Sequence, residues 1–160
     1  MEKKLTQEEL LFIKEAIDFY KNFAAKTLKM GALITALGVL FGHLVIGFSL
    51  NDTMLMTVGT SLIIIYTWYN VFEKPKNRLK QDFERGIKII QVATVNKIKK
   101  SKEGKIYLMN NELEVKESDF DDDEEIKGSI DKGSELILTY TPYHKMILNI
   151  QRNRTAPNQV

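Results

Sequence analysis

The sequence lacks cysteine altogether and contains only two histidines among its 160 residues. Without cysteine the chain cannot form disulfides, use a catalytic thiolate or ligate a metal through sulfur. Two histidines are too few for a histidine-rich metal site. The 23 basic and 21 acidic side chains leave a formal charge of +2, which is too balanced to indicate wholesale binding to nucleic acid. We therefore expect no cofactor, no metal and no nucleic-acid partner.

Charge is also missing from one long stretch, because Asp52 is the only charged residue between Met30 and Phe72. Two apolar segments lie there, residues 30–50 and 54–72. Each has the roughly 20 residues that a helix needs to cross a bilayer core of about 30 Å. So small a chain could not bury two helices that are apolar on every side. A cleaved signal peptide fits poorly, because 29 residues precede the first segment. The pattern predicts a transmembrane helical hairpin over residues 30–72.

The distribution of basic residues predicts the orientation of this hairpin. Only residues 51–53 link the two predicted spans, and they contain no lysine or arginine. Six lysines lie in residues 1–29, and five lysines and arginines lie in residues 73–85. The positive-inside rule therefore predicts that both termini are cytoplasmic, with the protein in the inner or plasma membrane of a prokaryote. Tyr66, Trp68 and Tyr69 would then lie at the inner membrane interface.

Residues 1–29 are predicted to form an N-terminal amphipathic helix. Thr6 and Glu9 have the spacing of a capping box, which marks a helix start. Apolar residues then recur three or four positions apart, at Leu10, Ile13, Ile17, Tyr20, Ala24 and Leu28. This face can lie in the membrane interface, on a partner or on the protein's own cytoplasmic part, and the pattern does not choose between them.

A basic connector at residues 73–85 leads into a segment with the character of a β domain. Pro75 suits a first helical turn, and Gly86 suits a helix end. Five segments rich in strand-forming residues then alternate with turn residues. The predicted strands are residues 87–98, 105–110, 112–116, 135–140 and 145–150. Residues 86–150 are thus expected to form a small cytoplasmic SH3-like or OB-like β-barrel, followed by a disordered tail at 151–160. The predicted fold class is an α+β membrane protein.

Within the predicted spans, small and polar residues are the candidates for helix packing or oligomer contact. Gly38 and Gly42 lie four residues apart, a spacing that lets helix backbones approach closely, and Ala32 and Ala36 repeat it. His43 is the one ionisable side chain well inside a span, where such groups are costly. A hairpin folded about Asp52 would place His43 level with Thr60 and Ser61, and either hydroxyl could accept or donate a hydrogen bond. A role for His43 in a pore or at a partner stays open.

Two clusters of charge lie in the predicted β domain. Five lysines gather at the tip of the first hairpin, at Lys97, Lys99, Lys100, Lys102 and Lys105. Such a tip near the inner leaflet could touch anionic lipid, although solvation alone also explains it. Nucleic acid is a poor fit, because no arginine and few stacking aromatics accompany the lysines. The acidic stretch at residues 119–125 lacks the EF-hand spacing and is expected to be a solvated loop.

No catalytic signature is present: the sequence has no nucleophile elbow, phosphate-binding glycine loop or HExxH. We therefore expect a non-enzymatic protein, a membrane-anchored interaction module or accessory subunit of a membrane complex. Its expected partners are the lipid bilayer and a protein, which could be a second copy. The alternative is a small homo-oligomeric membrane pore, for which the small-residue face and His43 are the motivation.

Overall fold

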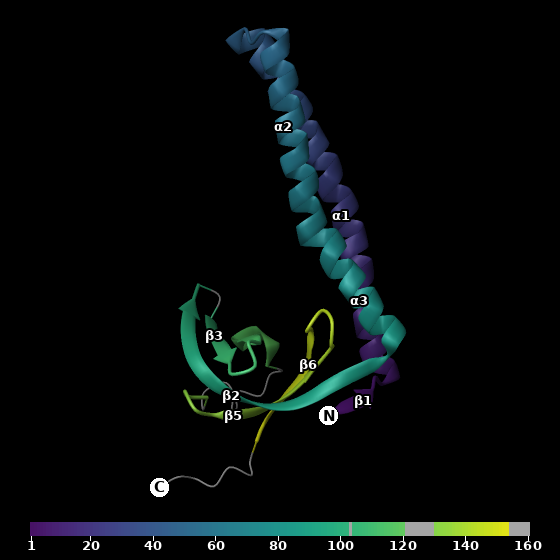
Figure 1. The fold of residues 1–160 in the computed structure, drawn as a ribbon, viewed down its shortest axis with the longest axis vertical. Coiled ribbons are helices and arrows are strands. Elements are labelled where there is room, and N and C mark those ends of the chain that lie inside the picture. The colour runs from purple at the N-terminus through teal and green to yellow at the C-terminus, as the bar shows by residue number, and fades with distance from the viewer. Residues whose placement is uncertain (103, 121–129, 154–160) are drawn as a thin grey trace. The chain divides into compact units, whose positions relative to one another are not determined.

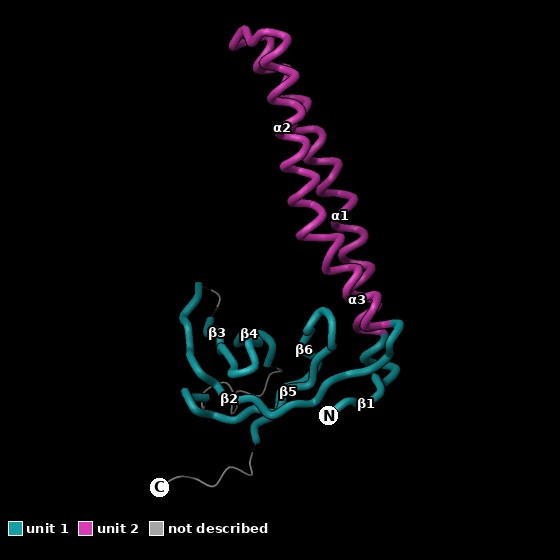
Figure 2. The backbone as a smooth tube through the Cα atoms, in the orientation of Figure 1, with its two compact units in different colours: residues 1–10, 84–160 teal, residues 11–83 magenta. Residues whose placement is uncertain are grey.

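The computed structural model describes residues 1–102, 104–120 and 130–153. The chain divides into two compact units, which Figure 2 distinguishes by colour. A sheet unit contains residues 1–10 and 84–160, and a helical unit contains residues 11–83. The expected α+β class is confirmed, because long helices and a curled antiparallel sheet are both present (Figure 1).

Two continuous helical rods form the helical unit. The first consists of α1 (Gln7–Phe41) and a π-helical turn, η1 (Gly42–Ile46). The second consists of α2 (Leu50–Trp68), a π-helical turn η2 (Tyr69–Glu73) and α3 (Lys74–Arg85). The expected N-terminal helix and first span are therefore one helix. The expected capping box is present at its start: the Thr6 N–H donates to Glu9 Oε2 at 2.8 Å, and the Glu9 N–H donates to Thr6 Oγ1 at 3.3 Å.

The basic connector is helical and continues the second rod. Pro75 has no N–H to donate to the preceding turn, and its ring crowds the carbonyl four residues earlier. The π-helical turn η2 lies at that point, and widened turns of this kind accommodate such a conflict. Gly86 follows the end of α3 with φ at +63°, a left-handed conformation that glycine adopts without strain. Gly86 thus ends the helix as expected.

The turn of the hairpin lies earlier than expected. It is formed by residues 47–49, whereas the expected link, residues 51–53, belongs to the first turn of α2. Gly47 has φ at +75° and donates its N–H to the Gly42 carbonyl, which closes η1. Ser49 then caps α2, because its hydroxyl oxygen accepts the Asp52 N–H at 3.2 Å. Asp52 thus lies in a first helical turn, where a negative charge is favourable.

The expected apolar face of α1 packs within the helical unit. Ile13 and Ala24 are buried, as are Leu79 and Asp82 of α3. The Trp68 indole N–H donates to the Ala24 carbonyl at 3.1 Å, and this bond joins the two rods. Gly31 allows a second close approach, since a Cβ there would lie 3.2 Å from the Ile64 side chain. The structure thus shows this face packed on the second rod, a covering that differs from the membrane, partner and cytoplasmic β domain that the sequence left open.

The described part of the sheet unit contains six strands: β1 (Glu2–Lys4), β2 (Ile87–Ser101), β3 (Gly104–Met109), β4 (Glu114–Lys116), β5 (Glu135–Tyr140) and β6 (Ile147–Arg152). All pairings are antiparallel, in the order β4-β3-β2-β5-β6, with β1 beside the start of β2. The five expected strands are all present within a few residues. The long strand β2 bends at a bulge between Val95 and Lys97, so it pairs with both β5 and β3.

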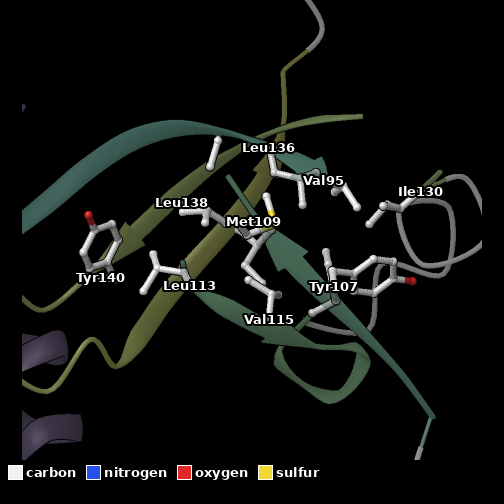
Figure 3. Close-up of a cluster of buried hydrophobic side chains, with 12 residues drawn as sticks. Val95, Tyr107, Met109, Leu113, Val115, Ile130, Leu136, Leu138 and Tyr140 are labelled. Carbon is white, nitrogen blue, oxygen red and sulfur yellow. The ribbon is translucent and has the colours of Figure 1, made fainter. Parts of the chain in front are cut away.

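The sheet curls into a half-barrel around a single apolar core, shown in Figure 3. Val95, Tyr107, Val115, Leu136 and Leu138 are fully enclosed there. A short 3₁₀ turn, η3 (Glu117–Asp119), follows β4 and approaches β6. Among the described strands no pairing joins β4 to β6, so they form an open half-barrel, which is coarser than the SH3-like or OB-like β-barrel that was expected. The expected tail begins slightly late, since β6 runs to Arg152 and Asn153 still donates its N–H to the Glu135 carbonyl at 3.0 Å, and residues 154–160 lie outside the described residues.

The strand β1 was not expected, and it ties the N-terminal residues to the sheet. The Ile90 N–H donates to the Met1 carbonyl at 2.8 Å, and the Leu5 N–H donates to the Gly86 carbonyl at 2.9 Å. Lys88 then donates to both carboxylate oxygens of Glu9, at 2.7 and 2.8 Å. The residues before α1 and its first turn are therefore clamped to the residues just after α3.

This clamp predicts a pH-dependent contribution to stability. Glu9 lies before the predicted spans. Burial alone would raise the pKa of its carboxyl group. Hydrogen bonds from Lys88 and Thr6, together with the positive charge of Lys88, lower this pKa below the usual 4.5. A lowered folded-state pKa stabilises the fold above the unfolded-state pKa and ceases to do so as the pH falls through the folded-state value.

We predict that Lys88→Met lowers the free energy of unfolding by about 1 kcal/mol at pH 7. The difference from the wild type should shrink as the pH falls below 4.5, where Glu9 becomes protonated. Thermal unfolding of the full chain in detergent between pH 7 and pH 3 measures both effects. An equal loss at both ends of this range would show that Lys88 acts through packing and not through charge.

Candidate functional site

The two glycines of the first predicted span have different surroundings. A Cβ added at Gly42 would lie 2.8 Å from the Phe48 ring, so this glycine admits Phe48 against the turn. A Cβ added at Gly38 would have no heavy atom within 4 Å. Gly42 thus serves the hairpin itself, and Gly38 opens on a free surface. The two do not form one packing face against the second rod.

His43 lies near the turn and is not brought together with Thr60 or Ser61. Since Gly31 lies opposite Ile64 and Phe23 opposite Phe72, the same register places His43 level with Asp52. In the described part of the chain no hydrogen bond joins His43 to Thr60 or Ser61. The Thr60 hydroxyl donates to the Met56 carbonyl at 2.7 Å instead. The expected alignment was wrong because the turn lies four residues earlier than residues 51–53.

An apolar groove of about 550 Å³ runs between α1 and α2. Its lining includes Ala32, Ala36 and Ser61, so the alanine pair of the small-residue pattern faces this groove. Thr35 and Thr57 also line it, but their hydroxyls donate to the Gly31 and Thr53 carbonyls at 2.9 and 2.7 Å. With these hydroxyls bonded within their own helices, the groove suits an acyl chain or an apolar side chain and does not suit an ion.

Aromatic side chains surround the end of α2. Tyr66 and Tyr69 are exposed, and Trp68 is held by its bond to α1. The Phe23 and Phe72 rings meet at 5.8 Å between centroids. Amphipathic rings of this kind are typical of the headgroup level of a bilayer, and they lie where the sequence predicts the inner interface.

The lysine cluster lies at the β2–β3 hairpin. Lys97, Lys99, Lys100 and Lys102 are exposed, and Lys105 is half-buried. Lys97 and Lys99 pair across the sheet with Leu108 and Ile106, so cationic and apolar side chains share that face. Within residues 1–102, 104–120 and 130–153, no ion pair involves a lysine of this cluster. The cluster can therefore offer its charge to an anionic surface.

The acidic stretch at 119–125 lies mostly outside the described residues. Of its members, Asp119 accepts the Lys116 N–H at 2.8 Å, and the Phe120 ring packs edge-on against Tyr107. The Tyr107 hydroxyl is buried without a hydrogen-bond partner. Burial, reinforced by Glu117 and Asp131, raises its pKa, so the hydroxyl stays neutral at physiological pH. Within the described ranges, no cluster of acidic or histidine side chains could hold a metal.

Comparison with family models, curated proteins and solved structures finds no match for this chain.

The glycine geometry predicts that Gly42→Leu and Gly38→Leu differ. Gly42→Leu should lower the free energy of unfolding by roughly 1–3 kcal/mol, because added atoms overpack the Phe48 ring. Gly38→Leu should leave hairpin stability unchanged, because its side chain enters open space. Thermal unfolding in detergent compares the two.

The double variant Gly42→Leu, Phe48→Ala is the matched control, since it removes the ring that the leucine displaces. It should recover stability relative to Gly42→Leu alone. Equal stability of the two glycine variants would contradict this account of the turn.

Proposed function

We propose that this protein is a membrane-anchored, non-catalytic interaction module, an accessory subunit that presents its half-barrel at the cytoplasmic face of a membrane. The observation that carries the proposal is the exposure of its apolar helices. Both rods are long and apolar enough to cross a membrane, and only 6% of the most apolar window of each is buried. In water, so large an apolar surface would drive aggregation, whereas a bilayer covers it.

The local chemistry of the helical unit supports this placement. The rods, residues 7–46 and 50–85, far exceed the roughly 20 residues that a bilayer core requires. Charged residues are absent from α1 beyond Lys29, and the aromatic side chains near Trp68 lie at the same level of the other rod. We therefore place the membrane over residues 30–46 and 50–69, with the remaining helical residues forming a cytoplasmic stalk. The basic residues of the stalk favour this orientation.

The sheet unit supports the interaction role. Its core is closed by its own residues, and its β2–β3 hairpin carries four exposed lysines beside half-exposed Ile106 and Leu108. The chain joins the sheet unit to the helical unit at both ends, so the proposed membrane anchor tethers these lysines to the same membrane as its anionic headgroups. Lys97, Lys99, Lys100, Lys102 and Lys105 are thus proposed to contact anionic lipid.

A homo-oligomeric pore is the alternative function. The free surface at Gly38 is the observation that favours it, because close helix contact could form there. A pore also needs a polar lining, and the hydroxyls of Thr35, Thr57 and Thr60 are bonded within their own helices. The interaction module therefore agrees better with the geometry.

A pair of charge substitutions tests the membrane placement. Leu37 and Leu62 are exposed on the two rods within the proposed membrane region. Lysine at mid-membrane costs roughly 2.5–3.5 kcal/mol for each residue. We predict that Leu37→Lys with Leu62→Lys reduces the share of protein that stays in the membrane pellet after alkaline carbonate extraction.

Leu11→Lys is the matched control, because Leu11 is equally exposed on α1 but lies in the stalk. It should stay in the pellet like the wild type. Extraction of the wild-type protein by carbonate would overturn the proposed function.

A further inference from the structure

One apolar stripe of α1 is largely exposed in the helical unit, although its Phe23 ring meets Phe72 and its Leu40 lines the groove beside α2. Its positions alternate at spacings of four and three residues from Phe12 to Leu40. We name it the exposed seam, and it consists of Phe12, Ala16, Phe19, Phe23, Lys26, Met30, Leu33, Leu37 and Leu40. Lys26 is the only polar member. The seam is distinct from the face that contains Ile13 and Ala24 and packs on the second rod.

The part of the seam in the stalk cannot be covered by lipid under the proposed placement. Phe12, Phe19 and Phe23 are 49%, 60% and 49% exposed. At about 1.5 Å per residue, Phe19 lies roughly 16 Å and Phe12 roughly 27 Å beyond Met30, where the bilayer core begins. The headgroup region is only about 5–8 Å deep on each side. Phe12 and Phe19 therefore project beyond the bilayer, and most of the other exposed stalk positions of α1 are polar.

We propose that the exposed seam is the contact surface for a second copy of this chain, paired parallel in a dimer. The inference rests on the membrane-anchored arrangement proposed above, in which all copies share one orientation. Their α1 helices are then parallel, and each seam residue can meet the same residue of the other copy, as a two-fold axis requires. Alternating spacings of four and three keep such a contact continuous along two supercoiled helices.

The chemistry along the seam fits this pairing. The Phe19 and Phe23 rings stack with 5.6 Å between their centroids, and the Phe23 ring also meets Phe72. These contacts hold the aromatic side chains in place within one copy of the chain. In the proposed membrane region the same stripe continues through Met30 and three leucines. The proposed contact between the two α1 helices can therefore extend from the stalk into the bilayer. Lys26 interrupts it at the level of Tyr69, near the headgroups, where a long side chain can extend toward anionic lipid. A single polar seam position of this kind helps to set the register.

The absence of cysteine allows a direct test by disulfide cross-linking of the full chain in native membranes. Ala16→Cys places a thiol on the seam, and Ala25→Cys places the matched thiol on an exposed position away from it. Because a disulfide requires Cβ atoms about 3.5–4.5 Å apart, we expect roughly tenfold more oxidised dimer from Ala16→Cys than from Ala25→Cys.

A second variant keeps the test specific to the seam. Phe19→Asp in the Ala16→Cys background should abolish the dimer, whereas Leu11→Asp, on an exposed apolar residue outside the seam, should leave it intact. Equal cross-linking of Ala16→Cys and Ala25→Cys, or a product between Ala16→Cys and a different protein without homodimer, would overturn the proposal. Carbonate extraction of the same membranes separates the two claims. Release of the protein by carbonate would contradict the proposed membrane anchor. Retention of the protein in the pellet without a seam-specific dimer would contradict only the proposed dimer contact.

Discussion

The rest of this structure depends on one constraint: many apolar side chains of its helices are not covered by other parts of the protein. From Met30 to Phe72 the chain contains one charge, and its two rods bury little of that apolar surface in each other. The proposed bilayer would cover this surface, because the backbone groups of such helices are bonded internally and their side chains match the lipid. The two rods are joined by the short turn at residues 47–49. Gly47 and Ser49 reverse the chain there, and Asp52 stabilises the start of α2.

The sheet unit has a core of its own, and its connection to the helices is local. Residues on both sides of the helical unit pair with each other through β1, β2 and the Glu9–Lys88 ion pair. Arg85, the last residue of α3, also donates to the Tyr143 hydroxyl at 2.8 Å and lies over its ring. The helical unit between residues 10 and 84 therefore begins and ends at residues that are bonded to each other.

The parts that could be predicted are those with strong local patterns. The strands were found because β-branched residues alternate with turn residues, and the helix ends at Thr6 and Gly86 because capping chemistry marks them. The hairpin turn was misplaced because polar residues 51–53 resemble a link, although Ser49 makes them a first helical turn. That error also misaligned His43 with Thr60 and Ser61. The strand β1 could not be predicted, because its three charged residues form a strand only through non-local pairing with β2. The aromatic stripe of Phe12, Phe19 and Phe23 was not predicted, because the face of Ile13 and Ala24 already gives α1 the pattern of an amphipathic helix.

The chain contains a single tryptophan, so the depth of Trp68 can be measured without any substitution. In vesicles that contain the full-length protein, lipids brominated at different acyl positions quench a nearby indole. The account places Trp68 at the inner interface, held by its bond to Ala24. It predicts strongest quenching by lipids brominated close to the headgroup, weaker quenching by those brominated near the bilayer centre, and little quenching by aqueous iodide. Strong quenching by iodide with none from any brominated lipid would contradict it.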